Sequence, residues 1–406
     1  MWHVECIAGG ILTRKPLIER IDRVDALEAV REDWNTLLET NETRTVELTY
    51  EWQMTHWKHF HADAKLFVLV VREAGSIVAI APLKLRRTGV PGIGGRRLEF
   101  IAAEESNYQD FIIGDRREEI LECILDYLAS HRMLWDVLSL RHVPETSTTA
   151  RFLLDRLDSR LLRRVETDRC ILLTLDKTWE EYAASSEKAR KKVAYRTRKL
   201  ERLGGELTYF HCSSEELFQS TLREFFALHR KRWTQTDTPS QFNDSRYCEF
   251  YLEVTPQLLP DGHIDLFVLR AGGRPVALLY CLVFGQQYTQ QLTAYDPEYA
   301  RGSPSLVMHE FFVREAFARD VEVFDFGHYY PYKELWADRL KTRMNFEIYP
   351  KAAFPYLIYA LATVYGLLRP SLRQITPLLK CVRYLRGRAR SSSEPIGETP
   401  DDSASS

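Results

Sequence analysis

Polar side chains follow an apolar strand near residue 325 and are of the types that move protons in enzymes. Asp325 interrupts the apolar run that begins at Val321, and Tyr330, Tyr332 and Lys333 follow within eight residues. A carboxylate at a strand end beside phenols and an ammonium is a candidate acid–base cluster. The alternative is that Asp325 turns the chain, that the tyrosines are half buried and that Lys333 faces solvent.

A second segment has the composition of an anion site. After a strand that ends at Tyr295, a loop carries Arg301, Gly302, Ser303 and Ser305, and a helix is predicted from about Ser305. A loop of small residues that opens a helix presents unpaired backbone N–H groups and the positive end of the helix dipole. The alternative is an ordinary helix start, in which one of the two serines caps the helix and a proline occupies its first turn.

The elements that position these residues occur twice along the chain. The tetrapeptide LFVL stands at 66–69 and again at 266–269, and each copy is followed by a turn containing glycine and then by a Val-Ala pair. Further on, HRMLWDVLSL in the first half corresponds to FARDVEVFDF in the second half. Strands and helices alternate in the same order in both halves, which predicts a duplicated α/β domain.

These motifs resemble a known family. The run through VALLYCLVF, AYDPEYARGSPS, FDFG and YPYKELWADR is similar to GNAT acyltransferases, within the branch of CelD-type cellulose-biosynthesis proteins. That branch is similar to the Fem-type aminoacyl transferases, and the resemblance covers about residues 30–345. It implies an α/β fold with two tandem GNAT-like (acyl-CoA N-acyltransferase) domains, each with a mixed central sheet flanked by helices. We place a non-catalytic domain at 16–165 and a catalytic domain at 166–350.

The resemblance also implies a reaction, in which an acyl group moves from acetyl-CoA, another acyl-CoA or an acyl-carrier thioester to an amine. The acceptor would be a small molecule or a glycan precursor. In this family a loop of the form Q/R-x-x-G-x-G/A cradles the pyrophosphate of coenzyme A. Here Arg301, Gly302, Ser303 and Ser305 would meet the donor phosphates, although the glycine spacing is not kept.

The roles of the acid–base residues follow from the same resemblance. Asp325 would bind or deprotonate the amine, Tyr330 or Tyr332 would protonate the thiolate, and Lys333 would meet an anionic group of the substrate. Trp336 is interpreted as packing. Two other functions stay open, namely aminoacyl transfer from tRNA and a non-catalytic scaffold in a membrane-associated polysaccharide system.

Two basic segments suggest partners. Residues 187–202 hold eight Lys and Arg with two Glu in a helical pattern, which fits the acidic surface of an acyl carrier protein or simply a solvated helix face. Residues 352–368 carry no charge, and seven Lys and Arg without an acid follow up to residue 390. We interpret 351–390 as a segment for peripheral contact with an anionic membrane, the alternative being a helix packed on the domain.

Composition bounds the remaining possibilities. The 55 basic and 57 acidic residues do not predict a nucleic-acid partner, and seven cysteines without a CxxC pair predict a reducing compartment. The expected location is therefore the cytoplasm, where the protein would associate with the cytoplasmic face of a membrane. His56, His59 and His61 invite a metal site, but half-exposed helix histidines are the commoner explanation, so no metal is predicted. The acidic segment 391–406 is predicted to be disordered.

Overall fold

The computed structural model describes residues 16–90, 93–156, 161–212, 215–234, 239–319 and 321–360. Residues up to Pro350 belong to one compact unit, and those from Lys351 onward belong to a second. The first half of the large unit contains β1 (Leu17–Ile21), α1 (Val24–Glu28), α2 (Arg31–Thr40), η1 (Val46–Leu48), α3 (Tyr50–Phe60), β2 (Lys65–Leu66), β3 (Val68–Glu73), β4 (Ser76–Ala81), β5 (Leu83–Val90), β6 (Ile93–Phe100), η2 (Ala103–Glu105), β7 (Ile112–Ile113), α4 (Arg117–Ser130), η3 (Arg132–Leu134), β8 (Val137–Pro144) and α5 (Thr148–Asp155).

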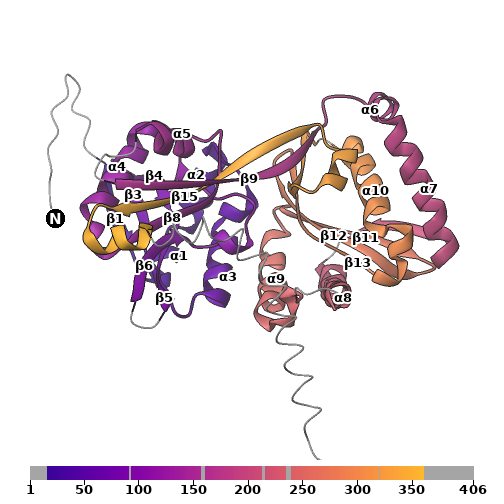
Figure 1. The fold of residues 1–406 in the computed structure, drawn as a ribbon, viewed down its shortest axis with the longest axis horizontal. Helices are drawn as coiled ribbons and strands as arrows, with labels where there is room; N and C mark the ends of the chain where they lie inside the picture. Colours follow the sequence, from indigo (N-terminus) through magenta and orange to yellow (C-terminus); the bar gives the residue numbers. More distant parts are fainter. Residues whose placement is uncertain are drawn as a thin grey trace, which may run out of the picture. The chain divides into compact units, whose positions relative to one another are not determined.

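The second half has a similar alternation of strands and helices (Figure 1). It contains β9 (Leu161–Thr174), α6 (Trp179–Ser185), α7 (Glu187–Gly204), β10 (Leu207–His211), α8 (Glu215–Trp233), η4 (Gln241–Asn243), α9 (Ser245–Leu258), β11 (Ile264–Ala271), β12 (Arg274–Phe284), β13 (Gln287–Tyr295), η5 (Pro297–Gly302), α10 (Pro304–Ala318), β14 (Val323–His328), η6 (Pro331–Leu335) and β15 (Arg339–Pro350).

Local sequence explains where several of these elements begin. Thr178 accepts a hydrogen bond from the backbone N–H of Glu181, and the Glu181 side chain accepts one in return, so α6 starts with a capping box. Proline occupies the first position of α10, where its missing N–H costs nothing. The continuous apolar run of β12 is buried along most of its length, as expected for a strand covered on both faces.

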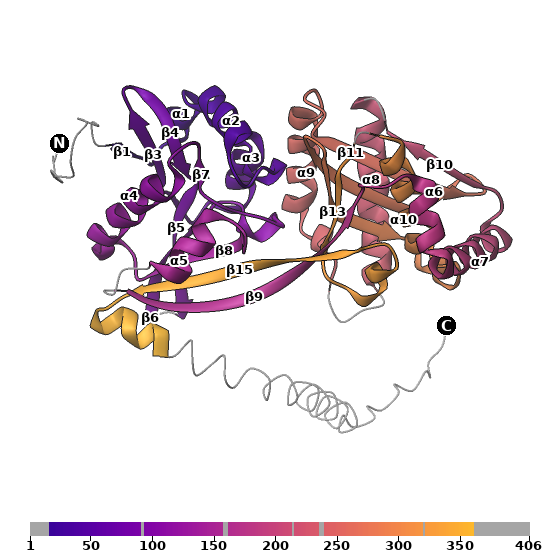
Figure 2. The same ribbon diagram turned by 90° about the horizontal axis from the view of Figure 1, so that it is seen from above.

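Two sheets hold the large unit together. A four-stranded sheet has the order β1-β3-β4-β7, and an eleven-stranded sheet has the order β10-β11-β12-β13-β14-β9-β15-β8-β6-β5-β2. The large sheet runs through both halves because β9 and β15 pair antiparallel from Arg339↔Leu172 to Pro350↔Leu161. Figure 2 shows these two long strands passing from one half to the other. The predicted domain boundary at 165/166 falls within β9, and the division into 16–165 and 166–350 stays a prediction.

The pairing supports the duplication inferred from the repeated motifs. In the first half β6 pairs antiparallel with β5 and parallel with β8, while in the second half β13 pairs antiparallel with β12 and parallel with β14. The prediction of a mixed α/β fold with strands and helices in the same order in both halves is confirmed. The short strand β7 pairs antiparallel with β4, at the edge of the four-stranded sheet.

One hydrophobic core is shared between the halves. It includes Trp34 and Trp52 from the first half and Phe250 from the second, and the rings of Trp52 and Phe250 meet edge to face at 5.0 Å. Because α3 and α9 bury Trp52 and Phe250 against each other, the halves stabilise each other by apolar burial.

The C-terminal part of the chain is described only at its start. Residues 353–360 are helical, and most of the predicted membrane-contact segment 351–390 and all of the predicted disordered segment 391–406 lie outside the described residues. Among the helices in the described ranges, none has the length and apolar character needed to cross a bilayer.

Candidate active site

The start of α10 is held by a close contact with α7. A Cβ atom placed on Gly302 would lie 2.9 Å from Leu200 Cδ1 and 3.0 Å from Leu200 Cα, so only glycine fits there without movement. An Arg196 guanidinium N–H also donates to the backbone oxygen of Arg301 at 2.9 Å. The contact of Gly302 with a donor phosphate stays a prediction, and the structure gives a separate reason for this glycine, which is the close packing of Leu200.

The serines of this loop have different environments. Ser303 is the N-cap of α10 with a left-handed backbone (φ +56°), and its side chain makes no capping hydrogen bond. The Oγ of Ser305 is buried and has no hydrogen-bond partner in the described part of the chain. A buried hydroxyl without a partner costs free energy, so such a group marks a place where a ligand or water completes the hydrogen bonding.

His309 lies one helical turn after Ser305 and is fully buried. Its Nε2 is 2.8 Å from Gln290 Oε1 on β13, so Nε2 carries the proton in this amide orientation. Burial, together with the nearby charge of Lys333, lowers the pKa of His309 to about 3. This imidazole is therefore neutral at physiological pH, and sequence reasoning missed it although it stands four residues after Ser305 on the same helix.

Trp336 packs against His309. Its ring lies 5.4 Å from the ring of His309, and its Nε1 is buried without a partner among the described residues. Ser305 stands one helical turn before His309 on α10, and the Trp336 ring, at the end of η6, packs on the His309 ring. We call Ser305, His309, Tyr332, Lys333 and Trp336 the α10–η6 site.

Lys333 is buried, contrary to the solvated alternative. Its ammonium donates to the backbone oxygens of Phe326 and, at 2.9 Å, of His328, which ties η6 to the end of β14. Burial lowers the pKa of Lys333 to about 8, although Asp325 opposes this shift. A lysine of this kind changes its charge within the physiological range.

Asp325 has both carboxylate oxygens engaged. The Tyr108 hydroxyl donates to Oδ2 at 2.5 Å, and the backbone N–H of Gly327 donates to Oδ1 at 2.7 Å. Asp325 and Tyr108 are both buried, and burial raises the pKa of Asp325. Because Tyr108 comes from the first half, this hydrogen bond links the two halves. No local sequence signal predicts it.

The two candidate tyrosines stand at the surface beside Lys333. The rings of Tyr330 and Tyr332 stack at 6.2 Å, and the Lys333 ammonium lies 5.2 Å from the Tyr330 ring. The Tyr332 ring is 6.3 Å from His309, and burial raises the pKa of its hydroxyl. Of the residues proposed from sequence, the structure therefore brings Ser305, Tyr332 and Lys333 together around His309. Asp325 is buried on β14 and interacts electrostatically with Lys333.

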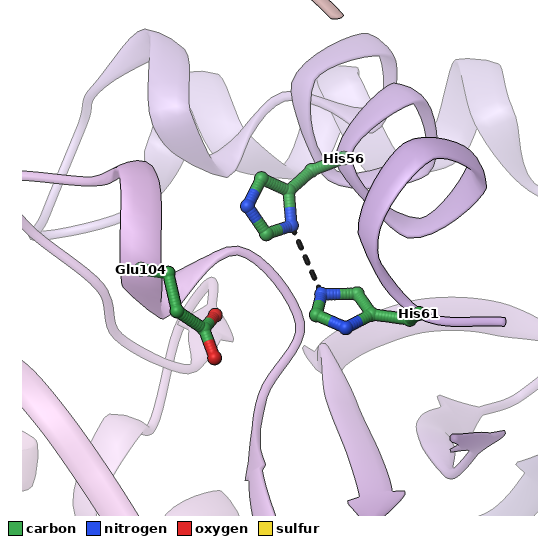
Figure 3. A group of neighbouring side chains, drawn as sticks. All are labelled: His56, His61 and Glu104. Carbon is green, nitrogen blue, oxygen red and sulfur yellow. Dashed lines mark hydrogen bonds between the residues drawn. The ribbon is translucent and has the colours of Figure 1, made fainter. Parts of the chain in front are cut away.

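One further cluster of side chains has the residue types of a metal site. His56, His61 and Glu104 have ligand atoms within 4.8 Å of one another (Figure 3). The buried ammonium of Lys84 lies among them, 3.0 Å from His61 Nε2 and 3.0 Å from a Glu104 oxygen. The side chain of Lys84 supplies the positive charge that a metal ion would bring. His59 instead contacts Glu253 at 2.8 Å.

Comparisons with known proteins agree with this fold. Residues 187–334 match the family model described as an acetyltransferase (GNAT) domain. A crystal structure of FemX shares 12% identity over 84% of this chain and 99% of its own, with a TM-score of 0.58. The C-terminal domain of a putative lysylphosphatidylglycerol synthetase from Agrobacterium fabrum shares 13% identity over 83% and 96%, with a TM-score of 0.50. The comparison with curated proteins found no match.

The family model assigns a GNAT acetyltransferase domain to residues 187–334. The similarity in fold to FemX extends over both halves of the chain, and the matched acetyltransferase domain lies in the second half. The α10–η6 site lies in the matched domain except for Trp336, which follows two residues after its end. The CelD-type branch stays a prediction.

Proposed function

We propose that this protein is an N-acyltransferase that moves an acyl group from acyl-CoA or an acyl-carrier thioester to an amine, with its reaction at the α10–η6 site. The observation that carries this proposal is the buried, unpartnered hydroxyl of Ser305 in the first turn of a 15-residue helix. A hydroxyl and free backbone N–H groups at a helix start stabilise negative charge as it develops on a thioester oxygen.

The proton transfers are assigned to the residues around Ser305. The attacking amine forms the C–N bond while the thioester C–S bond breaks, and the departing thiolate takes a proton. Tyr332 is the proposed donor of that proton, and Lys333 is the proposed partner for an anionic group of the substrate. Asp325 is fully buried and each of its oxygens already accepts a hydrogen bond, so we propose that it acts as a positioning residue that holds Gly327 and the end of β14.

The loop before α10 fits a donor in part. Arg301 is exposed, and Ser303 and Ser305 stand where the helix begins, so these three residues would meet donor phosphates. Gly302 is covered by Leu200 and would act by setting the distance between α7 and the loop. Coenzyme A, once bound here, would supply the thioester and the thiol leaving group.

Mass spectrometry of the purified protein tests this proposal. Native spectra should show a co-purified thioester or coenzyme A, or binding of added acetyl-CoA, and incubation with amines and isotope-labelled acetyl-CoA should yield labelled amides. Tyr332→Phe should slow the transfer about 10²-fold, as expected for the loss of a general acid. Tyr356→Phe, an exposed tyrosine outside the site, is the matched control. Unchanged transfer in Tyr332→Phe would remove this phenol from the reaction.

Aminoacyl transfer from tRNA is the second candidate, and the basic helix α7 favours it. Arg198 and Arg202 are exposed and make no ion pair within the described ranges, while α7 packs against the loop that opens α10. This face would equally fit an acidic acyl carrier protein. Binding of tRNA that falls steeply with salt and is weakened by Arg198→Gln would favour the RNA donor. The polysaccharide scaffold is a third proposal, and transfer activity would refute it.

The acceptor and the location also stay proposals. A glycan-precursor amine is proposed from the CelD resemblance alone. Peripheral contact with an anionic membrane through residues 351–390 is proposed from their composition, which combines an apolar stretch with basic residues.

A further inference from the structure

A cavity of about 610 Å³ opens on the second half, next to the α10–η6 site. It lies between the start of α7, the last turn of α10 and the segment that joins η6 to β15. Its volume is in the range of small-molecule sites. Trp336 belongs to both places, since it packs on His309 and also lines the cavity.

The floor of this cavity is apolar and fixed. Leu173, Tyr182 and Trp336 are buried there, and Phe317 from the end of α10 packs on the same core. The Tyr182 hydroxyl donates to the backbone oxygen of Trp336 at 3.0 Å, which joins α6 to the η6 segment. A floor of this kind accommodates an apolar body of limited size and provides most of the burial free energy.

Two lysines on the rim form no ion pair with a described residue. Lys177 and Lys192 are both exposed and line the cavity, and neither makes an ion pair with a described residue. The neighbouring Lys191, by contrast, pairs with Glu187 at 2.6 Å. The rim therefore offers two ammonium groups to an anionic ligand.

Two carboxylates on the same rim are held by neutral donors. The Tyr329 hydroxyl donates to Glu334 at 2.6 Å, and the backbone N–H of Thr174 donates to both oxygens of Asp338 at 3.2 and 3.3 Å. Neutral donors orient a carboxylate without cancelling its charge. Within the described part of the chain neither acid forms an ion pair, so both carboxylates are available to a cationic group of a ligand.

The serine hydroxyls add acceptors to the rim. Those of Ser185 and Ser186 each donate to the backbone oxygen of Tyr182 at 2.8 Å. Because their protons are used, these two oxygens keep only lone pairs for a ligand of the cavity that both residues line, and lone pairs suit an ammonium. The rim thus combines cation-binding and anion-binding groups above one apolar floor.

We propose that this cavity binds the acceptor, and that the acceptor is a zwitterionic amine with an apolar body, such as an amino acid or a short peptide. Its carboxylate would contact Lys177 and Lys192, and its ammonium would contact Glu334 and Asp338. This assignment of the acceptor rests on the proposed function, because it places the amine on the segment that carries Tyr332 and Lys333. In the transfer the ammonium loses two protons, one of which ends on the thiol and the other in solvent.

Three small probes test this inference on the full chain. L-phenylalanine carries both charges, 2-phenylethylamine lacks the carboxylate, and 3-phenylpropanoate lacks the amine. We expect calorimetry or saturation-transfer NMR to show phenylalanine binding about three- to tenfold more tightly than either fragment. Equal affinity for all three probes, or tighter binding of one fragment than of phenylalanine, would overturn the proposal.

Two substitutions test the contacts of the ligand's carboxylate and of its ammonium separately. Lys192→Met should weaken phenylalanine and phenylpropanoate but not phenylethylamine, whereas Glu334→Gln should weaken phenylalanine and phenylethylamine but not phenylpropanoate. Lys191→Met, on the same helix and already paired, is the matched control and should bind all three probes like the wild type. Equal losses in Lys191→Met and Lys192→Met would overturn the assignment. Circular dichroism confirms that each variant is folded.

The failure of this inference differs from a failure of the proposed function. Phenylalanine binding that persists in a protein that neither binds nor uses acetyl-CoA would refute the N-acyltransferase proposal and leave the zwitterion site intact. Acyl transfer to hydrophobic amines at rates unaffected by Lys192→Met and Glu334→Gln would instead refute the site.

Discussion

The hydrogen bond between Tyr108 and Asp325 should stabilise the whole large unit, because it joins residues from the two halves. Tyr108→Phe removes the hydroxyl that lies 2.5 Å from Asp325 Oδ2 and keeps the ring. A fully buried carboxylate oxygen is then left without its donor, which costs about 1–3 kcal/mol. At about 2 °C for each kcal/mol in a unit of this size, the melting temperature should fall by about 2–6 °C.

The pH dependence of this loss has a definite sign. Burial raises the pKa of Asp325 in the native state, so its favourable contribution is present at acidic pH and is lost as the pH rises through the native pKa. Without the Tyr108 hydroxyl the native pKa rises further. The difference in unfolding free energy between wild type and variant should therefore be smallest at acidic pH and largest at neutral pH.

Urea denaturation at a series of pH values measures this effect. Tyr330→Phe is the matched control, since that tyrosine is half exposed and should have little influence on the midpoint. In an Asp325→Asn background the pH dependence of the Tyr108→Phe effect should disappear. If Tyr108→Phe unfolds at the wild-type midpoint at neutral pH, the hydrogen bond does not couple the halves and the reasoning is wrong.

Three further predictions concern the loop, the lysine and the C-terminal segment. Gly302→Ala should destabilise the protein by about 1–3 kcal/mol in urea denaturation, because the new Cβ would meet Leu200. Leu200→Ala in the same chain should recover part of this loss. No loss of stability in Gly302→Ala alone would contradict the packing argument. If Lys333 binds an anionic substrate group, kcat/KM should fall as the pH rises through about 8, where the ammonium loses its charge. Lys333→Arg should abolish that inflection. The same pH profile in both proteins would exclude this role. The full chain should sediment with anionic liposomes at low salt and be released at high salt, while a protein ending at Pro350 should stay in the supernatant; sedimentation of the shortened protein would place the contact elsewhere.

Local patterns in the sequence predict the elements that local interactions determine. The helix that begins near Ser305, the hairpin after Leu266 and the basic helix from Glu187 are all present, because apolar periodicity and turn residues act over a few positions. The repeated LFVL motif also finds its explanation in two equivalent hairpins, β3–β4 and β11–β12.

The sequence does not predict contacts between residues that are far apart along the chain. Tyr108 and Asp325 are 217 positions apart, and β15 pairs with strands that begin about 180 and 200 residues earlier. Gly302 has the spacing of a loop residue, yet its environment is set by Leu200 on another helix. Lys333 looks like a surface residue by type, and only the backbone oxygens of Phe326 and His328 make its burial favourable.

His309 shows what could have been found by a closer reading. It stands one turn after Ser305 in a helix whose other residues are mostly apolar, which is the pattern of a polar side chain directed inward. Its partner Gln290 belongs to β13, the strand that precedes this helix, so the pair joins consecutive elements. Neither residue belongs to the motifs that carry the family resemblance.

Binding of acetyl-CoA to wild type and Ser305→Ala, measured by calorimetry together with the urea midpoint, tests the central claim most directly. Ser305 Oγ has no partner in the described part of the chain, so its removal should leave the midpoint unchanged or slightly higher. If the hydroxyl contacts the donor, acetyl-CoA affinity should fall about tenfold, the loss expected for one hydrogen bond at a site that excludes water. Wild-type affinity in Ser305→Ala, or a lowered midpoint without loss of binding, would contradict an acyl-transfer site at the start of α10.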